Sequence, residues 1–367
     1  MKNGGKEPVP GAEATTEPEA SGARGDANAE QVGEWAAVEP GDKGLGLAHL
    51  VLDKGVRTKA IGQLYGLEFD IEDAGFEVSV FFDRYSRRLK VVDYEATDYR
   101  AMCERLTYLA KANEFTKIFL KAHQHDWQHF LALGFVLEGI IKYFYRGHDA
   151  FVLSKFLTAE RADTRDLVDE SRLIEKLMKR PRTYNPPPLP EGYRLVIAGR
   201  EHVPQMVRLY RRVFPTYPSP LTHPDYIDQT MQSHVLYRVV LNPKGRVVSA
   251  ASADLDEKNS NAELTDCATL KSERGKALMY HLLSRLEDDL RERGITTGYT
   301  LARAPSVGMN RVFYRLGYEY SGRLVNNCDI AGSFEDMNIW VKQLLPAGSE
   351  GSEAGGDSGA GDAPAAG

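Results

Sequence analysis

Apolar and polar positions alternate or recur with helical spacing over two parts of the chain, residues 44–157 and 191–345. Strand-like alternation and runs of β-branched and aromatic residues are typical of a sheet. In the first part these patterns predict strands at 76–82 and 89–94, a helix carrying Met102, Leu106, Leu109 and Ala110, a strand at 117–121, a helix at 127–133, and strands at 139–145 and 150–153.

The second part has a similar mixture, and its turn at 242–245 (Asn-Pro-Lys-Gly) is typical of a hairpin. Leu278, Leu282, Leu286 and Leu290 form one apolar helical stripe. The predicted elements are a strand at 193–197, a helix at 203–214, strands at 235–241, 247–253 and 262–269, a helix at 276–293, a strand at 297–302, a helix at 308–316, and strands near 320–324 and 337–341.

The rest of the chain lacks this patterning. Residues 158–190 begin with a charged helical stretch and end in Tyr-Asn-Pro-Pro-Pro-Leu-Pro, which favours an extended linker. Residues 1–43 and 346–367 are rich in Gly, Ala, Glu and Pro, and we expect both tails to be disordered. The sequence therefore predicts two domains, 44–157 and 191–345, between two tails.

Charge and cysteine content narrow the class of protein. The formal charge is −6, but nine acids and four bases at 1–43 give −5 and four acids at 346–367 give −4, so 44–345 carries −6 + 5 + 4 = +3. This mild excess does not indicate nucleic-acid binding. No apolar run long enough for a membrane span and no secretory signal is seen. Three cysteines without metal-ligand spacing favour a cytoplasmic protein without a metal site, and the oligomeric state is left open.

A repeat links the two patterned parts. Residues 115–121 with 130–139, and 296–302 with 313–322, both read as a strand, a helix, an aromatic-x-x-Leu-Gly-aromatic motif and a strand. We therefore expect two related folds in one chain, of which only the second carries an equipped site.

The chemistry is expected where the strand at 262–269 leads into the Leu-striped helix. The connection contains Arg274, Gly275 and Lys276. The start of a helix has unpaired N–H groups and a positive dipole end, so it can bind a pyrophosphate. Glycine allows close approach of the backbone, and the two cations add positive charge.

Residues 191–345 resemble the GCN5-related N-acetyltransferases, the GNAT superfamily, whose signature is Arg/Gln-x-x-Gly-x-Gly/Ala. This chain offers Arg-Gly-Lys-Ala-Leu-Met at 274–279, with Ala277 and Met279 departing from the small residues. The resemblance implies an α/β (α+β) GNAT fold with a mixed, mostly antiparallel sheet flanked by helices, preceded by a degenerate GNAT-like domain. It also implies acetyl-CoA as co-substrate, bound by Cys267, Ala268, Thr269, Arg274, Gly275, Lys276, Ala277, Leu278 and Asn310.

A closer resemblance, over about 217–340, is to the β-lysine N6-acetyltransferases, which make the osmolyte Nε-acetyl-β-lysine. It rests on Tyr-Pro-Ser-Pro at 217–220, Glu-Leu-Thr-Asp-Cys-Ala-Thr at 263–269, Gly-Met-Asn at 308–310, Leu-Val-Asn-Asn at 324–327 and Met-Asn-Ile-Trp at 337–340. The implied partner is a small-molecule amine, β-lysine. Another small amine, a protein lysine, or a non-catalytic acyl-CoA-binding role remain alternatives.

Catalytic roles follow from the chemistry of amine acetylation. A lysine-like amine with a pKa near 10.4 must lose a proton before attack, and Glu263 stands where many relatives place the general base. Strand alternation places Asp266 on the opposite face unless a bulge intervenes, either as a ligand of the substrate ammonium or as an alternative base. A backbone N–H at Cys267 or Ala268 is expected to stabilise the oxyanion. In the family, a tyrosine commonly protonates the leaving CoA thiolate. The position of that tyrosine is Phe313 in this chain, so we predict that the neighbouring Tyr314 is the general acid.

Substrate selection requires anchoring of the far end of β-lysine. Arg303 is the candidate for a bidentate clamp on the carboxylate. Tyr217, Asn326 and Asn327 are further candidates for polar contacts with the substrate.

Overall fold

The computed structural model describes residues 47–53, 56–61, 66–330 and 332–345. The predicted tails, 1–43 and 346–367, lie outside the described residues. Within the described part, no helix is both long and apolar enough to cross a membrane.

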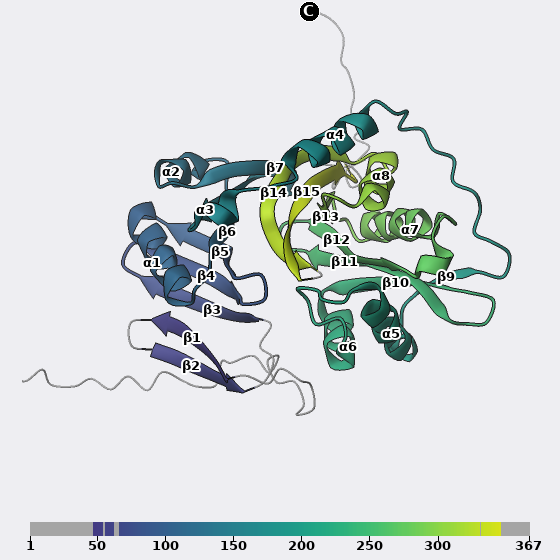
Figure 1. The fold of residues 1–367 in the computed structure, drawn as a ribbon, viewed down its shortest axis with the longest axis horizontal. Coiled ribbons are helices and arrows are strands. Elements are labelled where there is room, and N and C mark those ends of the chain that lie inside the picture. The colour runs from purple at the N-terminus through teal and green to yellow at the C-terminus, as the bar shows by residue number, and fades with distance from the viewer. Residues whose placement is uncertain (1–46, 54–55, 62–65, 331, 346–367) are drawn as a thin grey trace, which may run out of the picture. The chain divides into compact units, whose positions relative to one another are not determined.

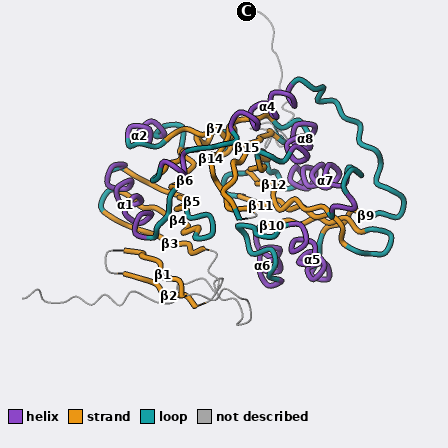
Figure 2. The backbone as a smooth tube through the Cα atoms, viewed as in Figure 1, coloured by secondary structure: helices purple, strands orange, loops and turns teal. Residues whose placement is uncertain are grey.

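Both patterned parts contain strands and helices (Figure 1). Up to the linker they are β1 (Leu47–Asp53), β2 (Val56–Ile61), β3 (Gly66–Asp73), β4 (Phe76–Asp83), β5 (Arg88–Ala96), α1 (Tyr99–Ala112), β6 (Lys117–Ala122), α2 (Trp127–Ala132), β7 (Val136–Tyr145) and β8 (His148–Phe156). The linker contains α3 (Ala159–Ala162) and α4 (Leu167–Met178), and a loop then runs from α4 to β9 (Figure 2).

The elements of the C-terminal segment, residues 191–345, follow the predicted order with one addition. They are β9 (Arg194–Ile197), α5 (Val203–Val213), α6 (Pro224–Ser233), β10 (Val235–Leu241), β11 (Val247–Asp256), β12 (Asn261–Thr269), α7 (Leu278–Glu292), β13 (Thr297–Arg303), α8 (Val307–Arg315), β14 (Glu319–Ile330) and β15 (Ser333–Gln343). The addition is α6, which starts with Pro224 in its first turn, a position that favours proline.

One 13-stranded sheet runs through both segments in the order β3-β4-β5-β6-β8-β7-β14-β15-β13-β12-β11-β10-β9. The pairs β5/β6 and β12/β13 are parallel, and the other neighbours are antiparallel. The predicted mixed, mostly antiparallel sheet flanked by helices is therefore confirmed. The division into separate domains stays a prediction.

Apolar stripes bury helices on both faces of β10–β12. Leu278, Leu282, Leu286 and Leu290 pack α7 against one face, together with Leu264 of β12. On the other face, α5 and α6 form a second cluster with Tyr237, Val239 and Ala268. Figure 1 shows α7 on one side of these strands and α5 with α6 on the other.

The N-terminal segment, the described part of 44–157, repeats the strand and helix arrangement of the C-terminal segment. It differs in that a side chain caps the start of its helix α1. The pair β5/β6 is held by three residue pairs, as is β12/β13. In α1 the Asp98 carboxylate caps the helix and accepts from the N–H of Ala101 at 2.9 Å. The equivalent place in α7 is Ala277, which has no side-chain cap. Of these two helices, only α7 therefore has backbone N–H groups at its start that no capping side chain occupies, so that they can bind a ligand.

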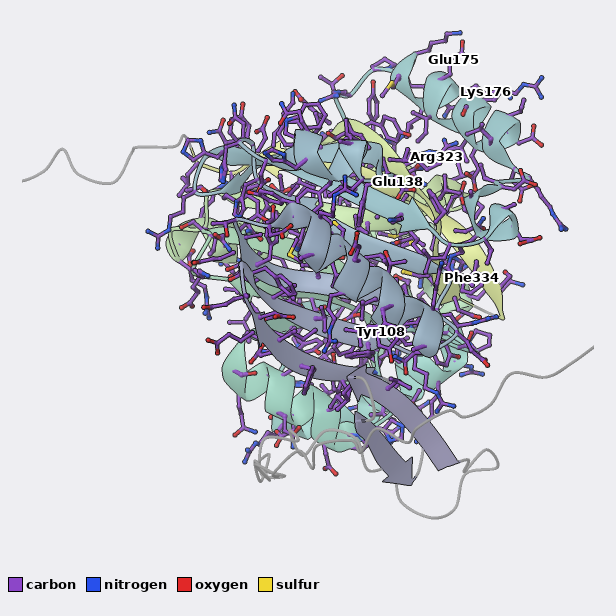
Figure 3. The ribbon with its side chains drawn as sticks, turned by 90° about the vertical axis from the view of Figure 1, so that its left-hand side faces the viewer. Tyr108, Glu138, Glu175, Lys176, Arg323 and Phe334 are labelled. Carbon is purple, nitrogen blue, oxygen red and sulfur yellow. The ribbon has the colours of Figure 1, made fainter. Side chains whose placement is uncertain are left out.

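Polar contacts join the N-terminal segment, the linker and the C-terminal segment where β7 meets β14; Figure 3 labels Glu138 and Phe334. The Glu138 carboxylate pairs with buried Lys117 at 2.9 Å and accepts from the backbone N–H of Val325 at 2.6 Å. Arg161 lies over the ring of Phe334, with 3.6 Å between the guanidinium carbon and the ring centroid. The N-terminal segment therefore contacts β14 of the C-terminal segment.

Candidate active site

A cavity of about 730 Å³ opens where β12 and β13 separate. The two strands pair only at Asn261 with Thr297, Ala262 with Gly298, and Glu263 with Tyr299. Beyond these pairs, residues 264–267 of β12 and 300–303 of β13 line opposite walls of the cavity. The parallel strands therefore leave a gap in the sheet that leads toward the start of α7.

The mouth of the cavity is formed by the predicted basic turn. Arg274, Gly275, Ala277 and Leu278 all line it. Gly275 has a φ of +87°, and a Cβ built there meets no atom within 4 Å, so the backbone borders open space. Together with the uncapped start of α7, this cradle fits a pyrophosphate. Met279 also lines the cavity, but its side chain is largely buried in the α7 cluster.

The residue before α7 adopts a conformation that favours glycine. Ala277 has a φ of +56° in the left-handed region, where a Cβ costs about 1–2 kcal/mol. We expect Ala277→Gly to raise the free energy of unfolding by up to about 1 kcal/mol, since relief of the strain exceeds the added flexibility of the unfolded chain. Thermal unfolding with and without CoA measures this, and a lower Tm without ligand would contradict it.

A bulge brings the acidic residues of β12 onto one face of the sheet. Between β11 and β12 the register passes from Ser252–Thr265 to Ala250–Ala268, so β12 has one extra residue. Asp266 lies in this bulge with a φ of +52°. Its carboxylate accepts from the Ser252 hydroxyl at 2.7 Å. Regular alternation, which would put Asp266 opposite Glu263, therefore does not hold here; the expected alternative, a bulge, breaks the two-residue period and places both carboxylates on one face.

Burial raises the pKa of both carboxylates on this face. It raises the pKa of Asp266 to about 7, partly offset by hydrogen bonds from Ser252 and Tyr217. Burial and the charge of Asp254, the cross-strand partner, raise the pKa of Glu263. The Tyr299 hydroxyl lies 3.4 Å from Glu263. Carboxylates with raised pKa values are suited to accepting a proton near neutral pH.

The buried charge of Asp266 has a cost in stability. A folded-state pKa of about 7 against an ordinary value of 3.8 means that the folded protein resists ionisation. The cost is therefore complete above about pH 7 and disappears as the pH falls toward 4. Asp266→Asn is expected to raise Tm by roughly 5 °C at pH 8 and much less at pH 4.5. A Tm that is unchanged or lowered at pH 8 would show that the carboxylate is stabilised by its partners.

Two predicted residues of α8 point into the protein. The Tyr314 hydroxyl donates to the carbonyls of Met178 and Arg180 in the linker, at 3.1 and 2.7 Å. Asn310 is fully buried; its Nδ2 donates to backbone carbonyls near the start of α8, and its Oδ1 accepts from Asn338 and Trp340. The geometry thus supports neither Tyr314 as general acid nor Asn310 as a cofactor ligand, because internal partners hold both side chains. Phe313 lines the cavity instead.

Some of the predicted substrate ligands line the cavity, and others are held by partners inside the protein. Tyr217 lines the cavity and contacts Asp266. Arg303 also lines the cavity, but its guanidinium makes a bidentate pair with Glu335. Asn326 binds the linker carbonyls of Arg161 and Asp163.

Asn327 also serves the junction between the segments. Its backbone carbonyl accepts hydrogen bonds from the Arg88 and Arg161 guanidinium groups, and its side chain is fully buried. Arg303 lines the cavity but its guanidinium is already paired with Glu335, Asn326 is bonded to the linker and Asn327 is buried, so the geometry does not favour these three predicted substrate ligands.

The remaining predicted cofactor residues lie at or beside the mouth. Cys267 and Thr269 line the cavity, and burial raises the pKa of the Cys267 thiol, so a thiolate nucleophile is disfavoured. Ala268, also in β12, is fully buried and is not among the residues that line the cavity. Lys276 lies outside the cavity lining, with its ammonium 2.6 Å from Glu273 and 2.9 Å from the Tyr193 hydroxyl.

Sequence reasoning missed cavity and acidic-face residues that come from distant strands and the linker. Ser252, Tyr299 and Tyr184 are in this group. Of these three residues, only Tyr299 could have been found from the sequence, because parallel pairing of its strand, β13, with β12 could be predicted. Among the residues that the structure describes, no group of three or more His, Cys, Asp or Glu side chains could hold a metal ion.

A split parallel strand pair beside an uncapped helix start, with buried carboxylates on the sheet, defines an acyl-CoA-dependent N-acetyltransferase. Residues 203–318 match the model of the acetyltransferase (GNAT) family. The chain is 40% identical to a β-lysine N6-acetyltransferase of Methanosarcina mazei, over 58% of this chain and 85% of that protein.

Two further relatives extend the similarity over nearly their whole lengths. One is a β-lysine N6-acetyltransferase of Methanococcus maripaludis, 32% identical over 74% of this chain and 97% of that protein. The other is the N-acetyltransferase YodP of Bacillus subtilis, 36% identical over 75% of this chain and 98% of that protein. The chain therefore belongs to the β-lysine N6-acetyltransferase family of the GNAT superfamily.

Proposed function

We propose that this protein transfers the acetyl group of acetyl-CoA to the N6 amine of β-lysine and so forms Nε-acetyl-β-lysine. The observation that carries the proposal is the similarity to two proteins named β-lysine N6-acetyltransferase over 85% and 97% of their lengths. The proposal includes an osmolyte role for the product and a cytoplasmic location, which the three free cysteines favour.

Acetyl-CoA supplies an activated thioester. In this proposal the backbone N–H groups at the start of α7 and the Arg274 side chain bind its pyrophosphate. The open space beside Gly275 supports this assignment, since a side chain there would enter the cavity. The gap between β12 and β13 then orients the reacting end toward the acidic face.

Glu263 is the proposed general base. An amine with a pKa near 10.4 arrives protonated, and Glu263 takes up that proton directly or through one water. Asp266 lies on the same face and lines the cavity, so it is suited to bind a substrate ammonium. Both carboxylates serve as anions that hold a cationic substrate.

The β12 bulge supplies the proposed oxyanion donor. Residues 266 and 267 fall between the ladder pairs at 265 and 268, so their N–H groups lie outside the regular β11–β12 pairing. The backbone N–H of Cys267 is the proposed donor, because this residue lines the cavity and Ala268 is buried. Such a donor stabilises the negative charge that develops on the carbonyl oxygen.

A release assay for free CoA tests the function. The purified full chain is given acetyl-CoA with β-lysine, α-lysine, spermidine or a lysine-containing peptide. We expect turnover of β-lysine with kcat/KM at least about tenfold above that of α-lysine, a difference of about 1.4 kcal/mol. Protection from heat by acetyl-CoA without turnover of any amine would indicate a binding module instead.

A further inference from the structure

Cations of the N-terminal segment lie beside the acidic face of the C-terminal segment. The Lys121 ammonium on β6 is 4.3 Å from the ring centroid of Phe144 and 5.9 Å from that of Tyr299. The hydroxyl of this same tyrosine is 3.4 Å from the Glu263 carboxylate. A single aromatic ring therefore connects a lysine of one segment to the proposed base of the other.

A second lysine, Lys90, lies on the same face of the sheet as Lys121. Lys90 on β5 pairs with Phe119 in the parallel ladder, and Phe119 lies two residues before Lys121 on one face of β6. The Lys90 ammonium lies 5.4 Å from the ring centroid of Phe81. Among the described residues, neither lysine has a carboxylate within ion-pair distance.

The two lysines influence each other electrostatically, and three carboxylates of the C-terminal segment act on Lys121. Burial and the charge of Lys90 lower the pKa of Lys121, while Glu263, Asp256 and Asp254 raise it. The two cations repel each other, and none of these carboxylates forms an ion pair with either lysine among the described residues. A bound carboxylate would relieve this repulsion, so the arrangement is suited to an anionic group of a ligand.

Neither lysine lines the cavity, but the apolar cluster that contains Phe144 and Tyr299 shares residues with the cavity lining. Leu301, Ile330 and Met337 line the cavity and also belong to or pack on the cluster that contains Phe144 and Tyr299. Tyr299 and Leu301 lie on the same face of β13, because they are two residues apart in a strand. An acceptor bound by Lys121 must therefore extend along this face of β13, from Leu301 past Tyr299 toward Lys121.

We infer that Lys121, assisted by Lys90, binds the carboxylate of the amino-acid acceptor, while the distal amine of the acceptor reaches Glu263. The inference rests on the proposed function. It also gives the N-terminal segment a role, as the source of positive charge in a site whose own candidate cation, Arg303, is paired with Glu335. Asp254 and Glu263 are then placed to hold the substrate ammonium groups.

The test compares β-lysine with 1,4-diaminopentane, which is β-lysine without its carboxylate. Lys121→Met keeps an apolar stem against Phe144 but removes the charge. We expect it to raise KM for β-lysine roughly 10- to 100-fold, the loss of one charge-assisted contact, and to leave kcat/KM for the diamine within about threefold. Lys121→Arg should restore much of the affinity for β-lysine.

Controls separate this inference from the function itself. Lys258→Met removes an exposed nearby lysine paired with Asp93 and should change neither substrate's KM. Calorimetry should give the same Kd for acetyl-CoA in wild type and Lys121→Met. An equal loss on both substrates, or no loss on either, would overturn the carboxylate anchor while wild-type turnover of β-lysine still upholds the function. Wild-type protein that leaves β-lysine unchanged would overturn the function.

Discussion

Replacing Glu263 by Gln is expected to lower kcat for β-lysine acetylation by roughly 10²- to 10⁴-fold, the range for loss of a general base. Gln keeps the size of the side chain and the contact with Tyr299, but it cannot take a proton from the substrate ammonium. Glu263 is not among the residues that line the cavity, although its neighbour Leu264 is, and it does not belong to the α7 turn, so the Kd for acetyl-CoA should stay within about twofold. The release assay gives kcat, and calorimetry gives Kd.

Two matched variants make this result specific. Glu257→Gln removes an exposed carboxylate on the nearby β11–β12 turn and should behave as wild type. Asp254→Asn removes the charge that helps to raise the pKa of Glu263. That variant should shift the acidic limb of the kcat/KM profile to lower pH and keep a functional base. A Glu263→Gln enzyme with wild-type kcat would exclude this residue as the base and would favour Asp266.

Replacing Gly275 by Glu is expected to weaken CoA binding by roughly 100-fold or more. The Cβ of any residue at 275 points into open space at the mouth of the cavity, so the new carboxylate would lie where the pyrophosphate is proposed to bind. Repulsion between two such charges a few ångströms apart is worth a few kcal/mol at the protein surface. Calorimetric titration with CoA measures the loss, and circular dichroism shows whether the fold is kept.

A series at this position separates charge from backbone strain. Gly275→Ala, Gly275→Gln and Gly275→Glu all place a Cβ at a φ of +87°, so each carries the same strain. Gln matches Glu in size without its charge. We expect Ala to bind CoA best, Gln less well and Glu worst. Equal affinities in Gln and Glu variants would contradict a pyrophosphate at this turn.

The strand–turn–helix unit could be predicted because its information is local. The Leu stripe of α7, the glycine at 275 and the cations beside it are all visible within about twenty residues of sequence. The internal repeat likewise predicted a second arrangement of strands and helices in the N-terminal segment. Hydrophobic periodicity and turn chemistry act over such short distances.

The misplaced site residues depend on contacts that are distant in sequence. Tyr314 is held by linker carbonyls more than 130 residues away, and Asn327 is held by Arg88 and Arg161. The side of the strand on which Asp266 lies depends on how β12 registers against β11. Strand alternation alone assumes a regular ladder, so it could not place that carboxylate correctly.

The most direct measurement of the central claim is to identify the product by NMR. Purified full-length protein is incubated with acetyl-CoA and β-lysine, and the acetylated nitrogen is assigned from its coupling to neighbouring carbon-bound protons. We expect acetylation at N6 alone, with one free CoA released for each product. Acetylation at the amine next to the carboxylate end, or no product beyond the uncatalysed background, would contradict it.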